Sequence, residues 1–208
     1  MRYADRPEAG RRLARALAHL RDTDPVIVAL PRGGIPVARE VADALDAPLD
    51  VLIVRKLGVP WHPEVAMGAI AEDGFRVLND DVLRSTGVRA GSVARVEAAE
   101  RAELARRIAL LRGDRQRIHL TGRTTVIVDD GVATGATAEV ACRAARAAGA
   151  ARIVLAVPVA SPDSVRRLSR VTDEVVCPWT SDALDSVGAA YRDFHQLGDD
   201  ESARLLDG

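Results

Sequence analysis

Residues 125–137 read TVIVDDGVATGAT, and this stretch decides how the rest of the chain is interpreted. It begins with apolar and β-branched residues without polar alternation, a pattern typical of a strand buried on both faces. Two carboxylates, Asp129 and Asp130, follow directly. A loop rich in glycine and threonine comes next, and residues 138–148 then have helical character. The order predicts a strand, an acidic pair, a loop and a helix.

The loop after the acidic pair has the composition of an anion-binding site. Gly131 and Gly135 allow sharp turns and a close approach of the backbone to a ligand. Because the loop opens a helix, free N–H groups and the positive end of the helix dipole face the same point. Thr134 and Thr137 add hydroxyl donors. The loop can hold a phosphate monoester, while the two carboxylates can accept hydrogen bonds from a diol or bind a hard cation.

This stretch resembles the signature of the type I phosphoribosyltransferases, which bind 5-phosphoribosyl 1-diphosphate (PRPP). The family motif is likewise an apolar strand, two acids and a loop of glycine and threonine. The resemblance implies that Asp129 and Asp130 bind the ribose 2- and 3-hydroxyls. Residues 133–137 would wrap the 5-phosphate, and the loop residues assigned to PRPP as a whole are Gly131, Ala133, Thr134, Gly135, Ala136 and Thr137. Neither a GxxxxGK[ST] P-loop nor a GxGxxG dinucleotide fingerprint is present.

A second glycine-rich loop lies between a predicted strand over residues 25–30 and a predicted helix. It reads Pro31-Arg32-Gly33-Gly34, so backbone N–H groups together with an arginine predict a second anion site. A tight turn with a solvent-exposed arginine is the alternative. The loop resembles the first βα loop of the family, which binds pyrophosphate and often holds a cis peptide. The resemblance therefore assigns Arg32, Gly33 and Gly34 to pyrophosphate.

Two further cations, Arg55 and Lys56, follow a predicted strand over residues 49–54, and Lys56 is the only lysine of the chain. Open α/β sheets bind ligands at the carboxyl ends of their strands, so the pattern predicts both cations at the ligand edge. The family has a basic residue here that reaches pyrophosphate, and either Arg55 or Lys56 matches it. A solvated strand end is the alternative.

The general acid or base is expected outside the phosphate loop. Some purine enzymes of the family carry an acid just before the TG of this loop, where Ala133 stands here. His62 and Glu64 follow the Arg55-Lys56 pair and are the nearest candidates in sequence. A structural role for both is the alternative, and Glu64 is also a candidate partner for Arg55.

Periodicity and turn signals place the remaining elements. Strands are predicted over residues 125–128, 152–157 and 174–177, and a hairpin over 64–70 and 75–78 with its turn at Asp73-Gly74. Helices are predicted over 6–20, 35–45, 80–86, 92–111, 163–168 and 199–206. Arginines crowd the end of the helix over 92–111, and they indicate either a solvated helix end or a mobile basic cover that closes over pyrophosphate. These arginines are Arg106, Arg107, Arg112, Arg115 and Arg117.

The composition limits the classes of function. The chain has 208 residues and 48% hydrophobic residues, enough for a folded α/β domain with its own core. Aromatic residues make up 3% and the net charge is −1, which argues against nucleic-acid binding. Cys142 and Cys177 lie in apolar segments without metal-ligand spacing, and the first residues lack a signal-peptide pattern. A cytoplasmic location is therefore expected.

The expected architecture is a single domain, residues 1–208, with a doubly wound, mostly parallel sheet and helices on both faces. The resemblance covers the core, about residues 25–177, and implies an irregular hood from residues 178–198 together with an N-terminal part. Phosphoribosyltransferases hold the acceptor base in such a hood. Trp179, Tyr191 and Phe194 are the candidates for stacking on it, with core packing as the alternative.

The resemblance implies an enzyme that transfers the phosphoribosyl group of PRPP to a nitrogenous base and releases pyrophosphate. Arg32, Lys56, Asp129 and Asp130 would carry the reaction, Mg²⁺ would bind with PRPP at the acidic pair, and a homodimer is expected. One alternative is a PRPP-binding regulator of the same fold that acts on RNA or DNA. Another is a hydrolytic or salvage activity on a nucleotide analogue.

Overall fold

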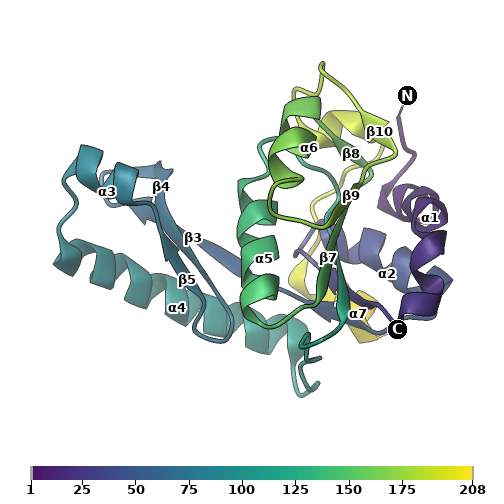
Figure 1. Ribbon diagram of the computed structural model, residues 1–208, viewed down its shortest axis with the longest axis horizontal. Helices are drawn as coiled ribbons and strands as arrows, with labels where there is room; N and C mark the ends of the chain where they lie inside the picture. The colour runs from purple at the N-terminus through teal and green to yellow at the C-terminus, as the bar shows by residue number, and fades with distance from the viewer. Residues whose placement is uncertain (1, 208) are drawn as a thin grey trace.

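The centre of the fold is a five-stranded sheet with the strand order β2-β1-β6-β7-β9, and every neighbouring pair is parallel. The computed structural model describes residues 2–207. The strands are β1 Val26–Ala29, β2 Leu49–Val51, β6 Thr124–Val128, β7 Arg152–Ala156 and β9 Glu174–Val176, of which β7 and β9 are labelled in Figure 1. The predicted α/β class with a doubly wound, mostly parallel sheet is confirmed.

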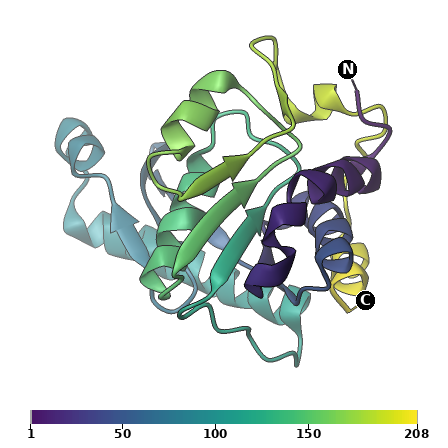
Figure 2. The same ribbon diagram turned by 45° about the vertical axis from the view of Figure 1, so that its right-hand side comes forward.

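Helices cover both faces of the sheet because successive strand residues point to opposite sides. In β6, Val126 packs into the cluster that contains α1 and α2, and Ile127 packs into the cluster that contains α5 and α6. Figure 2 shows the sheet between these two layers. The bounds of the four helices are α1 Arg6–Ala16, α2 Gly34–Leu45, α5 Ala136–Ala147 and α6 Pro162–Leu168.

An arm extends from the side of the sheet (Figure 1). It consists of a three-stranded antiparallel sheet with the order β3-β4-β5, together with two helices. The predicted hairpin with its turn at Asp73-Gly74 is the β4–β5 pair. Met67 of β4 packs with Val93 and Leu104 of the long arm helix. The bounds are β3 Val54–Val59, β4 His62–Ala71, β5 Arg76–Leu78, α3 Asp80–Thr86 and α4 Ala90–Arg112.

The predicted strand over residues 49–54 is wrong, and with it the placement of Arg55 and Lys56. Strand β2 ends at Val51, and the chain then leaves the parallel sheet and enters β3. Leu52 and Ile53, which connect β2 to β3, are buried. The sequence therefore stays apolar at the point where the hydrogen-bonded neighbour of the chain changes from β1 to β4. Arg55 and Lys56 therefore lie within an arm strand, opposite Ile70 and Ala69 of β4, and not at the carboxyl end of a core strand.

Three of the arginines considered for a mobile basic cover after the long helix are bound to other parts of the chain. Arg112 is 7% exposed, and its guanidinium lies 3.0 Å from Asp50 of β2 and 2.7 Å from Glu72 at the end of β4. Arg115 donates to the carbonyl of Leu206 at 2.8 Å. Arg117 pairs with Asp73. These cations are bound to the protein itself, and Arg112 joins the arm to the central sheet.

The remaining elements frame the two ends of the chain. The predicted helix over 6–20 is shorter than expected, because the α-helical pattern stops at Ala16 and a 3₁₀ helix follows. The predicted terminal helix is confirmed as α7, which packs against α2 and α4. Their bounds are η1 Ala18–Thr23, β8 Val159–Ala160, β10 Trp179–Thr180, η2 Val187–Ala190 and α7 Asp199–Asp207.

Both cysteines are free thiols, Cys142 buried in α5 and Cys177 half-buried after β9. Among residues 2–207, no helix has both the length and the apolar character that crossing a membrane requires.

The Arg112 network yields a stability prediction. Arg112→Ala leaves Asp50 and Glu72 buried without their shared cation, so we expect the free energy of unfolding to fall by about 3–5 kcal/mol. Urea unfolding followed by circular dichroism measures this loss. Arg106→Ala is the matched control, because the Arg106 side chain is 57% exposed in its pair with Glu103. Equal unfolding midpoints for the two variants would contradict the proposed role of the network.

Candidate functional site

The site lies where three neighbouring strands end in register. Ala29 of β1 is paired with Val128 of β6, and Val128 is paired with Ala156 of β7. The loops that follow these strands therefore leave the same edge of the sheet, the edge at which open α/β proteins bind ligands. The loop over 31–34 meets the acidic pair that follows β6, and residues 131–137 leave the same edge directly after this pair.

The glycines of the first loop allow this meeting. A Cβ atom at Gly33 would overlap the carboxylate of Asp130, and one at Gly34 would lie 2.5 Å from the carbonyl oxygen of Val128. Only glycine fits at either position without a shift of the second loop. The peptide between Pro31 and Arg32 is cis, as the resemblance implied.

The loop over residues 131–137, the candidate phosphate loop, presents an open helix start. Gly135, at a left-handed φ of 71°, precedes α5 as its N-cap, and no side chain of the described residues caps this helix. The first N–H groups of α5 are thus available to a ligand. Ala133, Thr134, Ala136 and Thr137 are all exposed.

Two serines that the sequence analysis missed hold this loop in place. The hydroxyl of Ser164 donates to the carbonyl of Ala133 at 2.5 Å, and Ser161 caps α6 beside it. The signal that could have indicated them is the Ser161-Pro162 start of a helix directly after β8.

The acidic pair is buried to different extents. Asp130 is 9% exposed, and its Oδ2 accepts a hydrogen bond from Nε of Arg6 at 2.8 Å. Asp129 is half-buried, and its Oδ1 accepts the backbone N–H of Asp130 at 2.9 Å. The hydroxyl of Tyr191 donates to the carbonyl oxygen of Asp130. Neither Arg6 nor Tyr191 was predicted to contact the pair.

Burial shifts the titration of both acids. Desolvation and the charge of Asp130 raise the pKa of Asp129 well above its ordinary value. Desolvation also raises the pKa of Asp130, although the hydrogen bond from Arg6 opposes this shift. The pair therefore has a higher affinity for protons, or for other positive charge, than two exposed aspartates would have.

An aromatic cluster of Tyr3, Trp179, Tyr191 and Phe194 packs beside the acidic pair. Tyr191 is 3% exposed, because its ring lies between those of Tyr3 and Phe194 at centroid distances of 5.6 and 5.1 Å. Trp179 meets Tyr3 edge-on at 5.9 Å. Phe194 is 37% exposed and lines a cavity. Base stacking by Trp179 and Tyr191 stays a prediction.

This cavity, of about 440 Å³, joins the two loops to the carboxyl-terminal part of the chain. Arg6, Arg32, Gly33 and Asp130 line one side, and residues 194–197 line the other. It places the candidate pyrophosphate loop, one of the two acids and an aromatic ring around one space.

The arm residues predicted for the site lie apart from these loops. Arg55 pairs with Glu100 at 2.6 Å, and Nζ of Lys56 lies 3.4 Å from Oε2 of Glu64. Glu64 therefore pairs with Lys56 and not with Arg55. His62 is exposed at the start of β4.

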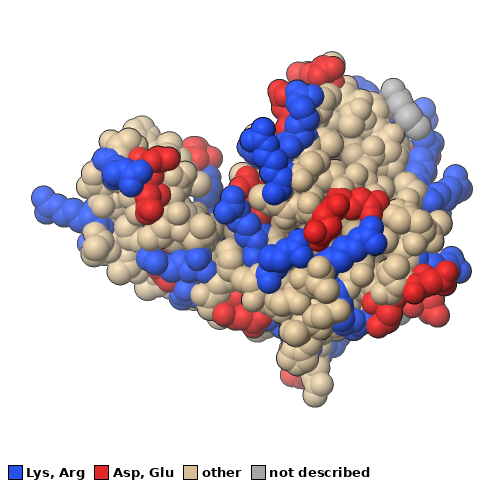
Figure 3. Space-filling view, viewed as in Figure 1, with Lys and Arg blue, Asp and Glu red and all other residues tan. Residues whose placement is uncertain are grey.

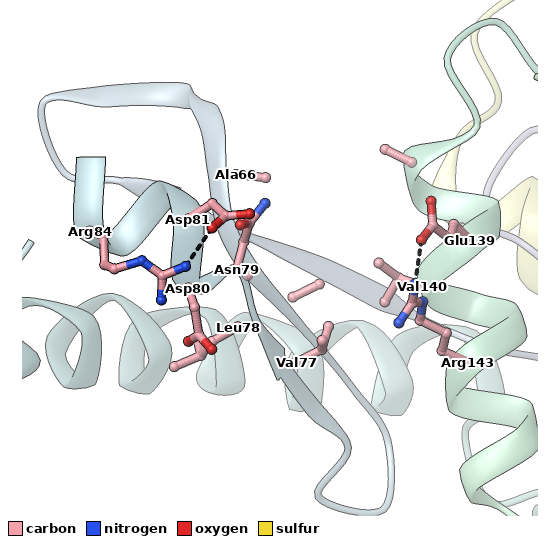
Figure 4. A pocket seen from close by; sticks show the side chains of 13 residues that line it. Ala66, Val77, Leu78, Asn79, Asp80, Asp81, Arg84, Glu139, Val140 and Arg143 are labelled. Atoms are coloured by element: carbon pink, nitrogen blue, oxygen red, sulfur yellow. Dashed lines mark hydrogen bonds and ion pairs between the residues drawn. The ribbon is translucent and has the colours of Figure 1, made fainter. Parts of the chain in front are cut away.

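A cleft of about 520 Å³ separates the arm from α5. Figure 4 shows Asp81 and Arg84 of the arm facing Glu139 and Arg143 of α5 across it. Ala136 lines this cleft and also belongs to the phosphate loop. The arm thus borders the site from the side of the phosphate loop.

Charge on the face of the molecule seen in Figure 3 is mixed, with basic and acidic side chains interspersed and a hollow between the arm and the body. This face lacks the continuous basic surface that nucleic-acid binding by electrostatics requires.

Fold and site together define an α/β protein with two glycine-rich loops and an acidic pair at one sheet edge. A family model described as the phosphoribosyl transferase domain matches residues 2–185. The chain belongs to the phosphoribosyl transferase family.

Named relatives agree with this assignment. "Putative phosphoribosyl transferase Rv0571c" of Mycobacterium tuberculosis (strain ATCC 25618 / H37Rv) is 55% identical over 205 residues, which are 99% of this chain and 46% of that protein. A protein of the same description, MT0597 of strain CDC 1551 / Oshkosh, matches equally. The chain spans about half the length of these curated relatives.

Solved structures show the same fold. The crystal structure of TT1426 from Thermus thermophilus is 43% identical, has a TM-score of 0.88, and covers 99% of this chain and 98% of its own. AQ2163 from Aquifex aeolicus is similar in fold alone, at 14% identity and a TM-score of 0.53, over 88% of this chain and 78% of its own.

The raised pKa of Asp129 yields a prediction about stability. Above pH 3.8, its ordinary pKa, the unfolded chain loses this proton more readily than the folded chain. The free energy of unfolding therefore falls as pH rises from there through the raised pKa. Asp129→Asn replaces the carboxyl group by a neutral amide and so removes this decrease in stability. It should raise the free energy of unfolding at pH 7 by about 0.5–2 kcal/mol.

Urea unfolding between pH 4 and pH 8 tests this expectation. The gain from Asp129→Asn should shrink as pH approaches 3.8. Asp22→Asn, which changes an exposed acid of η1, is the control and should leave the pH dependence unaltered. A loss of stability at neutral pH in the Asp129 variant would show that the buried carboxylate stabilises the fold instead.

Proposed function

We propose that the protein transfers the phosphoribosyl group of PRPP to a nitrogenous base and releases pyrophosphate. The observation that carries the proposal is the contact of Gly33 with the carboxylate of Asp130. It brings the anion-binding loop that follows β1 against the acidic pair that follows β6. The open start of α5 lies a few residues further along the chain.

Each part of PRPP then has a complementary group. The 5-phosphate accepts hydrogen bonds from the first N–H groups of α5 and from the hydroxyls of Thr134 and Thr137. The ribose hydroxyls donate to Asp129 and Asp130. The pyrophosphate binds the backbone of Gly33 and Gly34 and the guanidinium of Arg32. Lys56 and Arg55 reach this group only if the arm approaches the body.

Asp129 fits a role beside Mg²⁺. Proteins bind Mg²⁺ through one or two carboxylates together with substrate phosphates, and Asp129 is half-buried and free of the Arg6 contact that occupies Asp130. Among residues 2–207, no group of three or more His, Cys, Asp or Glu side chains could hold a metal by itself. When bound with PRPP, Mg²⁺ offsets the charge of the diphosphate.

The chain's own residues would act by position and charge. Cleavage of the bond to pyrophosphate leaves positive charge on the ribose ring and negative charge on the leaving group. Asp129 and Asp130 hold the ring in one orientation, while Arg32 stabilises the negative charge that develops. We propose that the hood, residues 178–198 with the N-terminal segment around Tyr3, holds the acceptor base near Trp179 and Tyr191.

The activity test is a screen for pyrophosphate release from PRPP and Mg²⁺ with purine and pyrimidine bases. Turnover with one or more bases is expected. In calorimetry, the double variant Asp129→Asn, Asp130→Asn should bind PRPP about 100-fold or more weakly, since hydrogen bonds to charged groups are lost. Asp80→Asn, Asp81→Asn changes an exposed consecutive acid pair on α3 and should leave affinity intact. Equal PRPP affinity in both variants would reject the assignment of the ribose site.

Lys56 allows a separate test of the arm. If the arm delivers Lys56 to pyrophosphate, Lys56→Ala should weaken pyrophosphate binding about tenfold and leave ribose 5-phosphate binding unchanged. The control is Arg84→Ala, which removes an arm cation whose side chain is 72% exposed. Equal losses for the two ligands would indicate a folding defect instead.

A further inference from the structure

Arg6, in the first helix, forms an ion pair with Asp130, one of the two acids assigned to the ribose. The side chain of Arg6 is 8% exposed, and its Nε donates to Oδ2 of Asp130 at 2.8 Å. Its guanidinium lies 3.8 Å from the centroid of the Phe194 ring. Its Nη1 also donates to the carbonyl oxygen of His195 at 2.9 Å. Arg6 thus joins Asp130 to the chain segment just before α7.

Asp199, in the last helix, forms an ion pair with Arg32, the arginine assigned to pyrophosphate. Oδ1 of Asp199, at the start of α7, lies 3.2 Å from Nη1 of Arg32. The side chains of Arg32 and Asp199 are 34% and 42% exposed, so this ion pair is weaker than the buried pair of Arg6.

The two contacts belong to one connected segment, residues 193–201. Arg6 binds its beginning through Phe194 and His195, and Arg32 binds Asp199 four residues after His195. Nε2 of His195 lies 3.1 Å from Oε1 of Glu201, which ties both ends of the segment together. The two contacts are thus joined by a short, hydrogen-bonded path.

Both contacts have the same chemistry as the substrate. A ribose hydroxyl donates to a carboxylate, as Nε of Arg6 does, and a diphosphate oxygen accepts from a guanidinium, as Asp199 does. Gly33 packs against the Asp130 carboxylate, and Arg6 holds its Oδ2. A diol that donates to Oδ2 of Asp130 from the position that Arg6 holds therefore competes with Arg6 for that oxygen.

We propose that Arg6 and Asp199 compete with PRPP for its own site, and that residues 193–201 form an autoinhibitory latch across it. This inference rests on the proposed function. Pyrophosphate alone replaces Asp199, and ribose 5-phosphate alone replaces Arg6. The intact donor replaces both, and release of either contact loosens the other. The latch thereby favours the binding of intact PRPP over the binding of pyrophosphate or ribose 5-phosphate alone.

The first test measures the affinity of the protein for pyrophosphate with Mg²⁺ by calorimetry. Asp199→Asn removes the competitor of Arg32, so we expect pyrophosphate to bind about two- to fivefold more tightly, the range that a half-exposed ion pair accounts for. Asp200→Asn is the matched control in the same turn of α7 and should bind pyrophosphate like the unaltered protein. Equal affinities for the two variants would overturn the proposal.

The second test follows amide hydrogen exchange of the unaltered protein with saturating ribose 5-phosphate. Residues 194–201 should exchange faster as Arg6 leaves Asp130. Unchanged or slower exchange in this segment overturns the latch while leaving the binding site in place. If Arg32→Ala binds pyrophosphate as tightly as the unaltered protein, and the Asp129, Asp130 double variant binds ribose 5-phosphate as tightly, the proposed function fails and the latch fails with it.

Discussion

The contact between Gly33 and Asp130 is the constraint on which the site depends. Two loops that follow adjacent parallel strands can touch only if one of them lacks side chains at the point of contact, and Gly33 and Gly34 meet this condition. The register of β1, β6 and β7 places the ends of these strands at one level, so the loops that follow them start side by side at the same edge of the sheet. A single methyl group at Gly33 would move the carboxylate and with it the candidate ribose site.

Burial of adjacent carboxylates at a sheet edge is unfavourable for the fold, and the surrounding structure compensates for it. Arg6 supplies a buried positive charge to Asp130, and the Tyr191 hydroxyl satisfies its carbonyl oxygen. The apolar layers on both faces of the sheet hold the strands in place independently of the two acids. This arrangement is common in binding sites, where groups are held ready for a ligand at some loss of stability.

The sequence was sufficient to predict the local βα units and both loops, because their signals lie within about ten neighbouring residues. It misplaced Arg55 and Lys56, since Leu52 and Ile53 remain apolar where the chain changes from one sheet to another. The partners of Asp130 and Arg32 could not be predicted. Arg6 is separated from Asp130 by 124 positions and Asp199 from Arg32 by 167, and neither has a local pattern that marks it.

The single lysine has a practical consequence. Its side chain is 46% exposed on β3, so an amine-reactive probe finds one ε-amine in the whole chain, and that amine lies on the arm. Arginines, which such reagents do not label, supply all the other permanent positive side chains. Trp61 lies on the arm close to Lys56 and would itself transfer energy to the fluorophore, so Trp61→Phe is needed first. In that variant, a fluorophore attached at Lys56 would report the position of the arm relative to the indole of Trp179 in the body, and no engineered cysteine is required.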